Sequence, residues 1–172
     1  MSNRPPIYVL DANVFIQAHR RWYTFDICPG FWLALLHHHK AGRIVSIDRV
    51  RKEIVAGDAL ADWAKDEAPS SLFASTADQA VASQFAAMMR WVQAQAQFRL
   101  EAKAEFAQEP DGWVAAYAKT HSDHVVVTHE EFSPDAKKRV PLPNVCRQFG
   151  VNYIDTFLML KDLKVQFQFE TP

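Results

Sequence analysis

The sequence has few of the residues that define several common protein classes. Its two cysteines, Cys28 and Cys146, lie far apart and outside any Cys-x-x-Cys or Cys/His spacing. We therefore expect neither a zinc site nor a disulfide, and we interpret both as buried apolar side chains in a reducing compartment. The chain has only five glycines, with no glycine-rich phosphate loop and no Gly-x-Ser-x-Gly elbow. The sequence thus gives no support to P-loop or serine-hydrolase chemistry.

Long hydrophobic runs and a dominant charge are also missing. The longest apolar run covers residues 31–36, and residues 1–6 contain no long apolar segment. A run this short cannot span a bilayer, and a secretory signal would need a longer one. We therefore expect a cytoplasmic protein that does not associate with membranes, with residues 1–6 flexible. The formal net charge is -1, so contacts with nucleic acid would need local basic clusters, such as those at residues 20–21, 49–52 and 137–139.

The length and composition fit one globular domain. The chain has 172 residues, of which 49% are hydrophobic, and we expect a single domain over residues 1–172. Short apolar runs predict strands at residues 7–10, 44–47, 125–128 and 151–154, with helical patterns between them. This alternation predicts an α/β fold of three α/β/α layers, in which a mostly parallel central sheet carries helices on both faces. Ligands of such sheets bind beyond the carboxyl ends of the strands.

Two further segments have patterns of their own. In residues 77–108, apolar side chains such as Val81, Phe85 and Met88 recur at steps of three and four, which predicts one long amphipathic helix or two with a kink. We interpret this segment as helical structure inserted within the domain. Residues 165–169 alternate apolar and polar side chains, which predicts an edge strand.

Four acidic residues follow or neighbour the predicted strands. Asp11 comes directly after the first strand, Glu53 lies in the helix after the second, Asp111 opens a later helix, and Glu130 follows the strand at residues 125–128. A parallel sheet can bring all four to one pocket. Two carboxylates about 4 Å apart repel by about 4 kcal/mol at an effective dielectric constant near 20, so such a cluster implies raised pKa values or a bound cation. Oxygen ligands without Cys or His predict Mg²⁺ or Mn²⁺.

Each of these acids also has a purely structural interpretation. Asp111 could be only a helix N-cap, Glu130 could be only a solvated loop residue, and Glu53 could pair with a nearby arginine. Asp11 is harder to explain in this way, because an acid directly after a buried strand is costly unless it caps, pairs or binds something. The histidines at residues 37–39 do not offer a competing metal site, since consecutive helical positions point in different directions.

Four segments together resemble the PIN-domain nucleases. They read YVLDANVFI, RVRKEI, DGWVAAYA and VVVTHEEF, in that order along the chain. The family pattern is a strand-end Asp-x-Asn or Asp-x-Ser, an acid in Val-x-x-Glu, an acid that heads a helix, and a final acid after Val-Val-Thr. The stretch at residues 20–32 also resembles a bacterial PIN-like subfamily allied to the VapC toxins. The resemblance spans nearly the whole chain and implies a PIN-like form of the predicted fold.

The resemblance implies metal-binding and catalytic acids at four positions: Asp11, Glu53, Asp111 and Glu130. Asn13 corresponds to the small polar helper beside the first acid. The family usually has Asp where this chain has Glu130, so either Glu130 or Glu131 could serve the metal. Further candidates for substrate contact or a helper role are Thr128, Glu131, Asp155, Arg20 and Arg21. Asp155 equally suits an N-cap for the helix that is predicted to begin at Thr156.

The function that the resemblance implies is a Mg²⁺- or Mn²⁺-dependent endoribonuclease that cleaves RNA phosphodiester bonds. It also implies the toxin of a toxin–antitoxin pair, with a protein antitoxin as partner, and it allows a homodimer. The alternative is a non-catalytic PIN-like module that binds RNA or protein. A haloacid-dehalogenase-like phosphatase also has an Asp after its first strand, but it needs Asp-x-Asp where this chain has Asp11-Ala12-Asn13.

Overall fold

The computed structural model describes residues 4–55 and 57–172 and has a parallel β-sheet at its centre. Within these residues the sheet has five strands in the order β3-β2-β1-β4-β5, and every neighbouring pair is parallel. The strands are β1 (Ile7–Leu10), β2 (Ile44–Ile47), β3 (Phe73–Ala74), β4 (His124–Val127) and β5 (Tyr153–Ile154). The predicted parallel sheet is confirmed, and β3 is a short strand that the sequence pattern did not predict.

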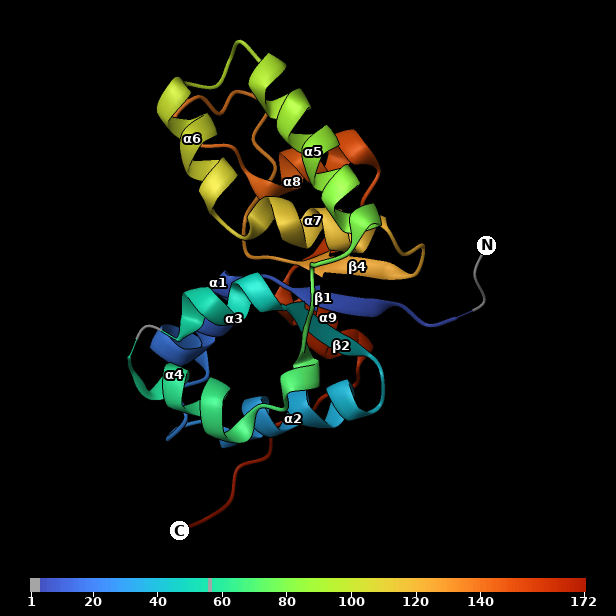
Figure 1. Cartoon of the computed structure of the whole chain (residues 1–172). Coiled ribbons are helices and arrows are strands. Elements are labelled where there is room, and N and C mark those ends of the chain that lie inside the picture. The colour runs from blue at the N-terminus through green and yellow to red at the C-terminus, as the bar shows by residue number, and fades with distance from the viewer. Residues whose placement is uncertain (1–3, 56) are drawn as a thin grey trace.

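Helices cover both faces of this sheet, which confirms the predicted three-layer α/β/α arrangement. Figure 1 shows α5 to α8 gathered on one side of the strands and α1 to α4 with α9 on the other. The α-helices are α1 (Ala12–Gln17), α2 (Pro29–Lys40), α3 (Asp48–Ile54), α4 (Ala59–Asp62), α5 (Gln79–Ala94), α6 (Leu100–Gln108), α7 (Asp111–Lys119), α8 (Leu142–Phe149) and α9 (Thr156–Asp162). Two π-helical segments, η1 (Ala18–Trp22) and η2 (Trp63–Glu67), and a 3₁₀ turn, η3 (Ser70–Leu72), complete the regular structure.

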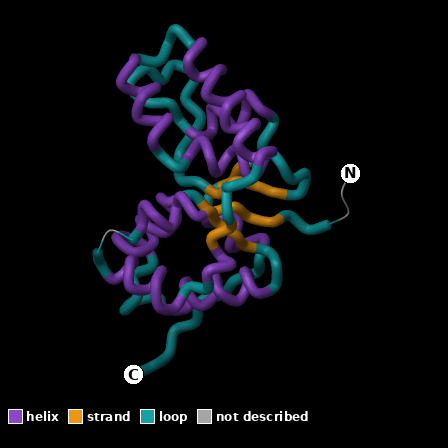
Figure 2. Tube along the Cα trace, in the orientation of Figure 1, coloured by secondary structure: helices purple, strands orange, loops and turns teal. Residues whose placement is uncertain are grey.

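Strand β1 lies in the middle of the sheet because its side chains are apolar on both faces. Tyr8, Val9 and Leu10 are all buried, and β1 pairs with both β2 and β4. Figure 2 shows the strands as a narrow band between the two helical layers. Since a parallel sheet aligns its strand ends, the residue that follows β1 lies at the centre of the carboxyl edge. That residue is Asp11.

The predicted helical segment at residues 77–108 forms two helices. Helix α5 ends at Ala94, and α6 begins at Leu100 after a short turn. The buried Lys103 in α6 fixes the two helices together, because its Nζ donates to the Gln93 carbonyl at 2.8 Å. Helix α5 packs mainly against α7, so the segment thickens one helical layer of the sheet.

The predicted edge strand at residues 165–169 is wrong. The structure has no strand in these residues, which extend along α2 instead of pairing with the sheet. The Phe167 ring packs against Tyr23 at a centroid distance of 5.4 Å, and an added Cβ on Gly30 would meet it at 3.4 Å. The period-two pattern does not mark one buried face, since Val165 is half-buried whereas Phe169 is 86% exposed.

The structure also bears on the predictions for the cysteines, the N-terminal segment and membrane-spanning helices. Both cysteines are free thiols, with Cys146 buried and Cys28 half-buried. Residues 1–3, part of the segment expected to be flexible, lie outside the described residues, whereas the Pro6 carbonyl accepts a hydrogen bond from Arg43 Nε at 2.9 Å. Among residues 4–55 and 57–172, no helix has the length and apolar composition needed to cross a membrane.

Candidate functional site

Asp11 is the most deeply buried of the acids near the carboxyl ends of the strands. Its Oδ1 atom accepts a hydrogen bond from the Val14 backbone N–H at 3.0 Å and so caps α1. Its Oδ2 atom is buried and has no hydrogen-bond partner among the described residues. Burial raises the pKa of Asp11 to about 7, while the nearby Thr128 hydroxyl and the Val14 N–H partly oppose this rise. The capping role therefore accounts for only one of the two carboxylate oxygens.

Asp111 lies beside Asp11 at the start of α7. It is the first residue of the helix and not its N-cap, which is Pro110. Burial and then the charges of Asp11 and Glu130 raise the pKa of Asp111 to about 8. The helix approaches its neighbours closely here, since a Cβ on Gly112 would lie 3.0 Å from the Phe85 ring. The close packing of the α7 N-terminus holds the Asp111 carboxylate in the interior.

Glu130 belongs to the same group of charges but already has protein partners. Its carboxylate pairs with the Arg139 guanidinium, and its Oε2 atom accepts the Leu142 backbone N–H at 2.8 Å. The charge of Glu130 nevertheless contributes to raising the pKa of both Asp11 and Asp111. Arg139 acts in the opposite direction on the pKa of Asp111. The site therefore includes an internal cation, which the sequence pattern did not predict.

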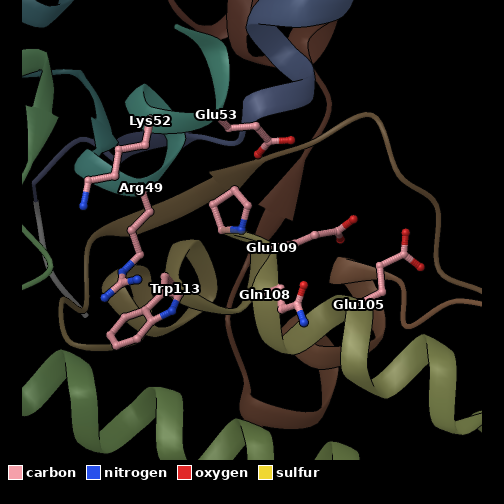
Figure 3. Close-up of a pocket in the computed structure, with 8 residues that line it drawn as sticks. Arg49, Lys52, Glu53, Glu105, Gln108, Glu109 and Trp113 are labelled. Carbon is pink, nitrogen blue, oxygen red and sulfur yellow. The ribbon is translucent and has the colours of Figure 1, made fainter. Parts of the chain in front are cut away.

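Glu53 lines a pocket whose lining residues do not include Asp11, Asp111 or Glu130, so the structure does not bring all four predicted acids to one pocket. Glu53 is exposed on α3, and partial burial raises its pKa. Figure 3 shows it lining the same pocket as Glu109, the residue two positions before Asp111. Burial, the charge of Glu105 and the charge of Glu53 all contribute to a raised pKa for Glu109. The structure thus adds Glu109 to the predicted acids, and the short spacing of Glu109 and Asp111 is the sequence signal that could have identified it.

The four uncharged or acidic residues that were predicted to contact substrate or assist the acids lie in different parts of the structure. Thr128 is buried directly after β4, and its Oγ1 atom accepts the Glu130 N–H at 3.2 Å. Asn13 is half-buried in the first turn of α1, and its backbone N–H favours the charged form of Asp11. Glu131 is exposed and lines a groove on the far side of Glu130. Asp155 caps α9 by accepting the Leu158 N–H at 2.8 Å, as its N-cap interpretation predicted.

Basic side chains border the acidic group on one side of the pocket. Arg49 and Lys52 of α3 line it together with Glu53 and Glu109, and Figure 3 shows the Arg49 guanidinium over the Trp113 ring. The guanidinium carbon lies 3.7 Å from the ring centroid, and Arg49 Nε also donates to Thr76 Oγ1 at 3.0 Å. Arg20 and Arg21 are exposed on η1 and do not line this pocket. The pocket, of about 530 Å³, therefore has a basic wall and an acidic wall.

A divalent cation fits the chemistry of the buried acids, although its ligands do not stand together in this structure. Within the part of the chain that the structure describes, no three His, Cys, Asp or Glu side chains form a group that could hold a metal ion. The unpartnered Oδ2 of Asp11, beside the buried Asp111, is nevertheless an oxygen that a hard cation would satisfy. Cys146 is not a competing ligand, because burial and the charges of Asp11 and Asp111 raise the pKa of its thiol. The metal site stays a prediction.

Comparison with known families gives one match. The model of the family described as "Domain of unknown function (DUF4411)" matches residues 8–167, a span that includes every candidate site residue. Searches of curated proteins and of solved structures found no significant match. The match covers the acidic pocket and both of its walls but attaches no activity to them.

Proposed function

The chain belongs to the DUF4411 family, and we propose that it is a metal-dependent endoribonuclease of the PIN type that cleaves RNA phosphodiester bonds. The observation that carries this proposal is the Oδ2 atom of Asp11, which is buried without a hydrogen-bond partner beside a second buried acid, Asp111. An arrangement of this kind destabilises the ionised protein, so a role other than folding is needed to explain it. The resemblance to PIN-domain nucleases supplies that role.

Asp11 and Asp111 would hold the cation, and Glu109, whose charge acts on Asp111, lines the neighbouring pocket with Glu53 and could help complete its ligands. A bound Mg²⁺ or Mn²⁺ supplies positive charge next to the scissile phosphate and lowers the pKa of water. Thr128 favours the charged form of Asp11, since its hydroxyl lowers the pKa of that carboxyl. Glu130 is held by Arg139 and by the Leu142 N–H, so it orients the loop before α8 and adds to the negative field at Asp111.

Arg49 and Lys52 serve a different purpose in this proposal. Their charges line the side of the pocket opposite the acids, where they could bind phosphates of an RNA strand whose scissile group lies at the carboxylates. Arg49 is held in place by its contacts with Trp113 and Thr76. A guanidinium that is fixed in this way loses little side-chain freedom when it binds a phosphate.

The toxin assignment is part of the same proposal. It rests on the resemblance of residues 20–32 to a PIN-like subfamily allied to the VapC toxins. An antitoxin could insert an Arg or Lys into the acidic pocket and so imitate the cation, which is a charge complementarity that the buried carboxylates would favour. A homodimer is compatible with the proposal, and we expect the protein to act in the cytoplasm.

One observation favours a second candidate, a non-catalytic PIN-like module that binds RNA or protein. Arg139 already pairs with Glu130 and lowers the pKa of Asp111, so the acidic group has a cation of the protein's own beside it. In that case the acids would need no metal, and RNA binding would not depend on one. Metal dependence of cleavage therefore separates the two candidates.

The test is cleavage of a labelled single-stranded RNA by purified protein with Mn²⁺ or Mg²⁺ and with EDTA. We expect cutting with metal, none with EDTA, and loss of cutting in Asp111→Asn. Asp78→Asn is a matched control, since Asp78 is an exposed N-cap of α5 that does not line the pocket, and it should cut like the wild type. RNA binding without cleavage under any metal condition would support the second candidate instead.

A further inference from the structure

Three aromatic rings, two of them exposed, form a cluster outside the pocket that Arg49 lines. Trp22 is the last residue of η1, His129 follows β4, and Phe157 lies in α9. The Trp22 ring lies 4.5 Å from the His129 ring and 5.4 Å from the Phe157 ring, in edge-to-face contacts. Trp22 is 41% exposed and Phe157 is 43% exposed. We call Trp22, His129 and Phe157 the aromatic patch.

The aromatic patch is continuous with the acidic group. His129 stands between Thr128 and Glu130 in the chain, and a groove joins these three residues to Asp155, Phe157 and Leu158. The groove is therefore lined by Thr128 and Glu130, whose side chains influence the pKa values of the buried Asp11 and Asp111. The His129 ring is fixed at this boundary by the 2.9 Å contact of its Nε2 atom with Thr156 Oγ1.

Positive charge lies next to the aromatic patch. Arg20 and Arg21 immediately precede Trp22 in η1, and both are exposed. Segment η1 is a π-helix, a wider turn than an α-helix, and such turns occur frequently at functional sites. Aromatic rings beside basic side chains are the combination by which proteins bind single nucleic-acid strands, since rings stack on bases while cations contact phosphates.

We propose that the aromatic patch is a base-stacking subsite, in which Trp22 stacks on an unpaired base of the RNA next to the phosphate that a cation bound by Asp11 and Asp111 would contact. This inference rests on the proposed nuclease function, because the acids define where the scissile phosphate lies. We favour a base over an apolar protein segment because Arg20 and Arg21 directly precede Trp22 and are exposed, so cations are available to contact phosphates beside the ring. Stacking selects for a flexible nucleotide that can leave a helix, and it tolerates every base.

The first measurement compares RNA binding by the Trp22 variants. A fluorescein-labelled single-stranded RNA is titrated with protein in Mg²⁺, in the Asp111→Asn background so that the RNA stays intact. Trp22→Ala should weaken binding by about tenfold or more, which is about 1.4 kcal/mol. Trp22→Phe should keep most of the affinity, whereas Trp22→Leu, which keeps bulk without an aromatic face, should resemble Trp22→Ala. Phe169→Ala removes an 86% exposed ring from the C-terminal tail and should bind like the background protein.

A second measurement reports stacking directly. The RNA carries one 2-aminopurine, whose fluorescence is quenched when it stacks on an aromatic ring. We expect quenching with the Trp22 and Trp22→Phe proteins and little quenching with Trp22→Leu. Circular dichroism and melting curves identify a variant that fails to fold, and Phe157→Leu then replaces it, because Phe157 is the other exposed ring of the patch. Affinity and quenching that do not change in folded Trp22→Leu and Phe157→Leu would overturn the proposal.

The outcomes also distinguish this inference from the proposed function. If the wild type cleaves RNA in Mn²⁺ and folded Trp22→Leu cleaves with an unchanged KM, the nuclease stands and the stacking subsite is wrong. If the wild type binds RNA with quenched 2-aminopurine and cuts under no metal condition, the subsite stands and the nuclease is wrong. Absence of any RNA binding would overturn both and leave the aromatic patch as a surface for a protein partner.

Discussion

Replacing Asp11 by Asn separates the charge of this side chain from its role as a helix cap. The Oδ1 atom of Asn can still accept the Val14 N–H, because Asn and Asp are about equally good N-cap residues. The substitution removes the negative charge at the buried Oδ2 position, which has no hydrogen-bond partner among the described residues. We therefore expect metal-free Asp11→Asn protein to be more stable than the wild type at alkaline pH.

The magnitude follows from the pKa of Asp11, which burial raises from 3.8 to about 7. Because the folded-state value lies above the unfolded one, the protonated group favours folding, and this contribution is lost as pH rises through the folded pKa. A rise of this size corresponds to an upper limit of about 4 kcal/mol lost by pH 8 and less than about 2 kcal/mol lost by pH 5. Removal of the Asp11 charge should also lower the pKa of Asp111, since that charge raises it.

The assay is urea denaturation in EDTA, followed by circular dichroism at pH 5 and at pH 8. The stability gain of Asp11→Asn over the wild type should be at least about twice as large at pH 8 as at pH 5. Asp78→Asn alters an exposed N-cap of α5 and should change stability by a similar small amount at both pH values. An Asp11→Asn protein that is less stable than the wild type at pH 8 would show that the carboxylate serves the fold, and the reasoning from its burial would be wrong.

Three further predictions concern the same site. A hundredfold excess of Mg²⁺ or Mn²⁺ over its Kd should stabilise the wild type by about 2.7 kcal/mol, and melting curves that coincide with those in EDTA would contradict this. Glu130→Ala should lower the free energy of unfolding by about 1 kcal/mol more than Glu130→Gln, because Gln can still accept the Leu142 N–H; equal losses in urea denaturation would refute that role. Induced wild-type protein without the neighbouring gene should arrest growth of its host while Asp111→Asn does not, and harmless expression of an active enzyme would exclude a toxin.

The sequence predicted the sheet well because its strands are buried on both faces and read as continuous apolar runs. Residues 7–10 and 44–47 correspond to β1 and β2 without any shift. The two-residue strand β3 was missed, since so short a segment has no periodicity to detect. The tail at residues 165–169 was predicted to be a strand from its alternation alone, but Phe167 and Phe169 are both exposed, so the alternation of so short a segment did not report a buried face.

Only those site residues that adjoin buried strands or helices could be predicted from the sequence. Asp11 and Asp111 were identifiable because each follows or heads a buried element, and their burial is a consequence of that position. The partners of Glu130 were not identifiable, since Arg139 and Leu142 reach it through the path of an irregular loop. The aromatic patch was equally hidden, because Trp22, His129 and Phe157 come from three separate elements that only the folded chain brings together.

The measurement that tests the central claim most directly is the initial rate of single-stranded RNA cleavage by Asp11→Asn in Mn²⁺ at pH 8. The protein is first shown to be folded by its melting curve. The proposed metal site predicts that the rate falls by at least about a hundredfold, the usual scale for loss of a group that stabilises charge in the transition state, while the melting temperature in EDTA does not fall. A variant that melts several degrees lower and still cuts at a rate comparable with the wild type would contradict both the metal site and the nuclease mechanism.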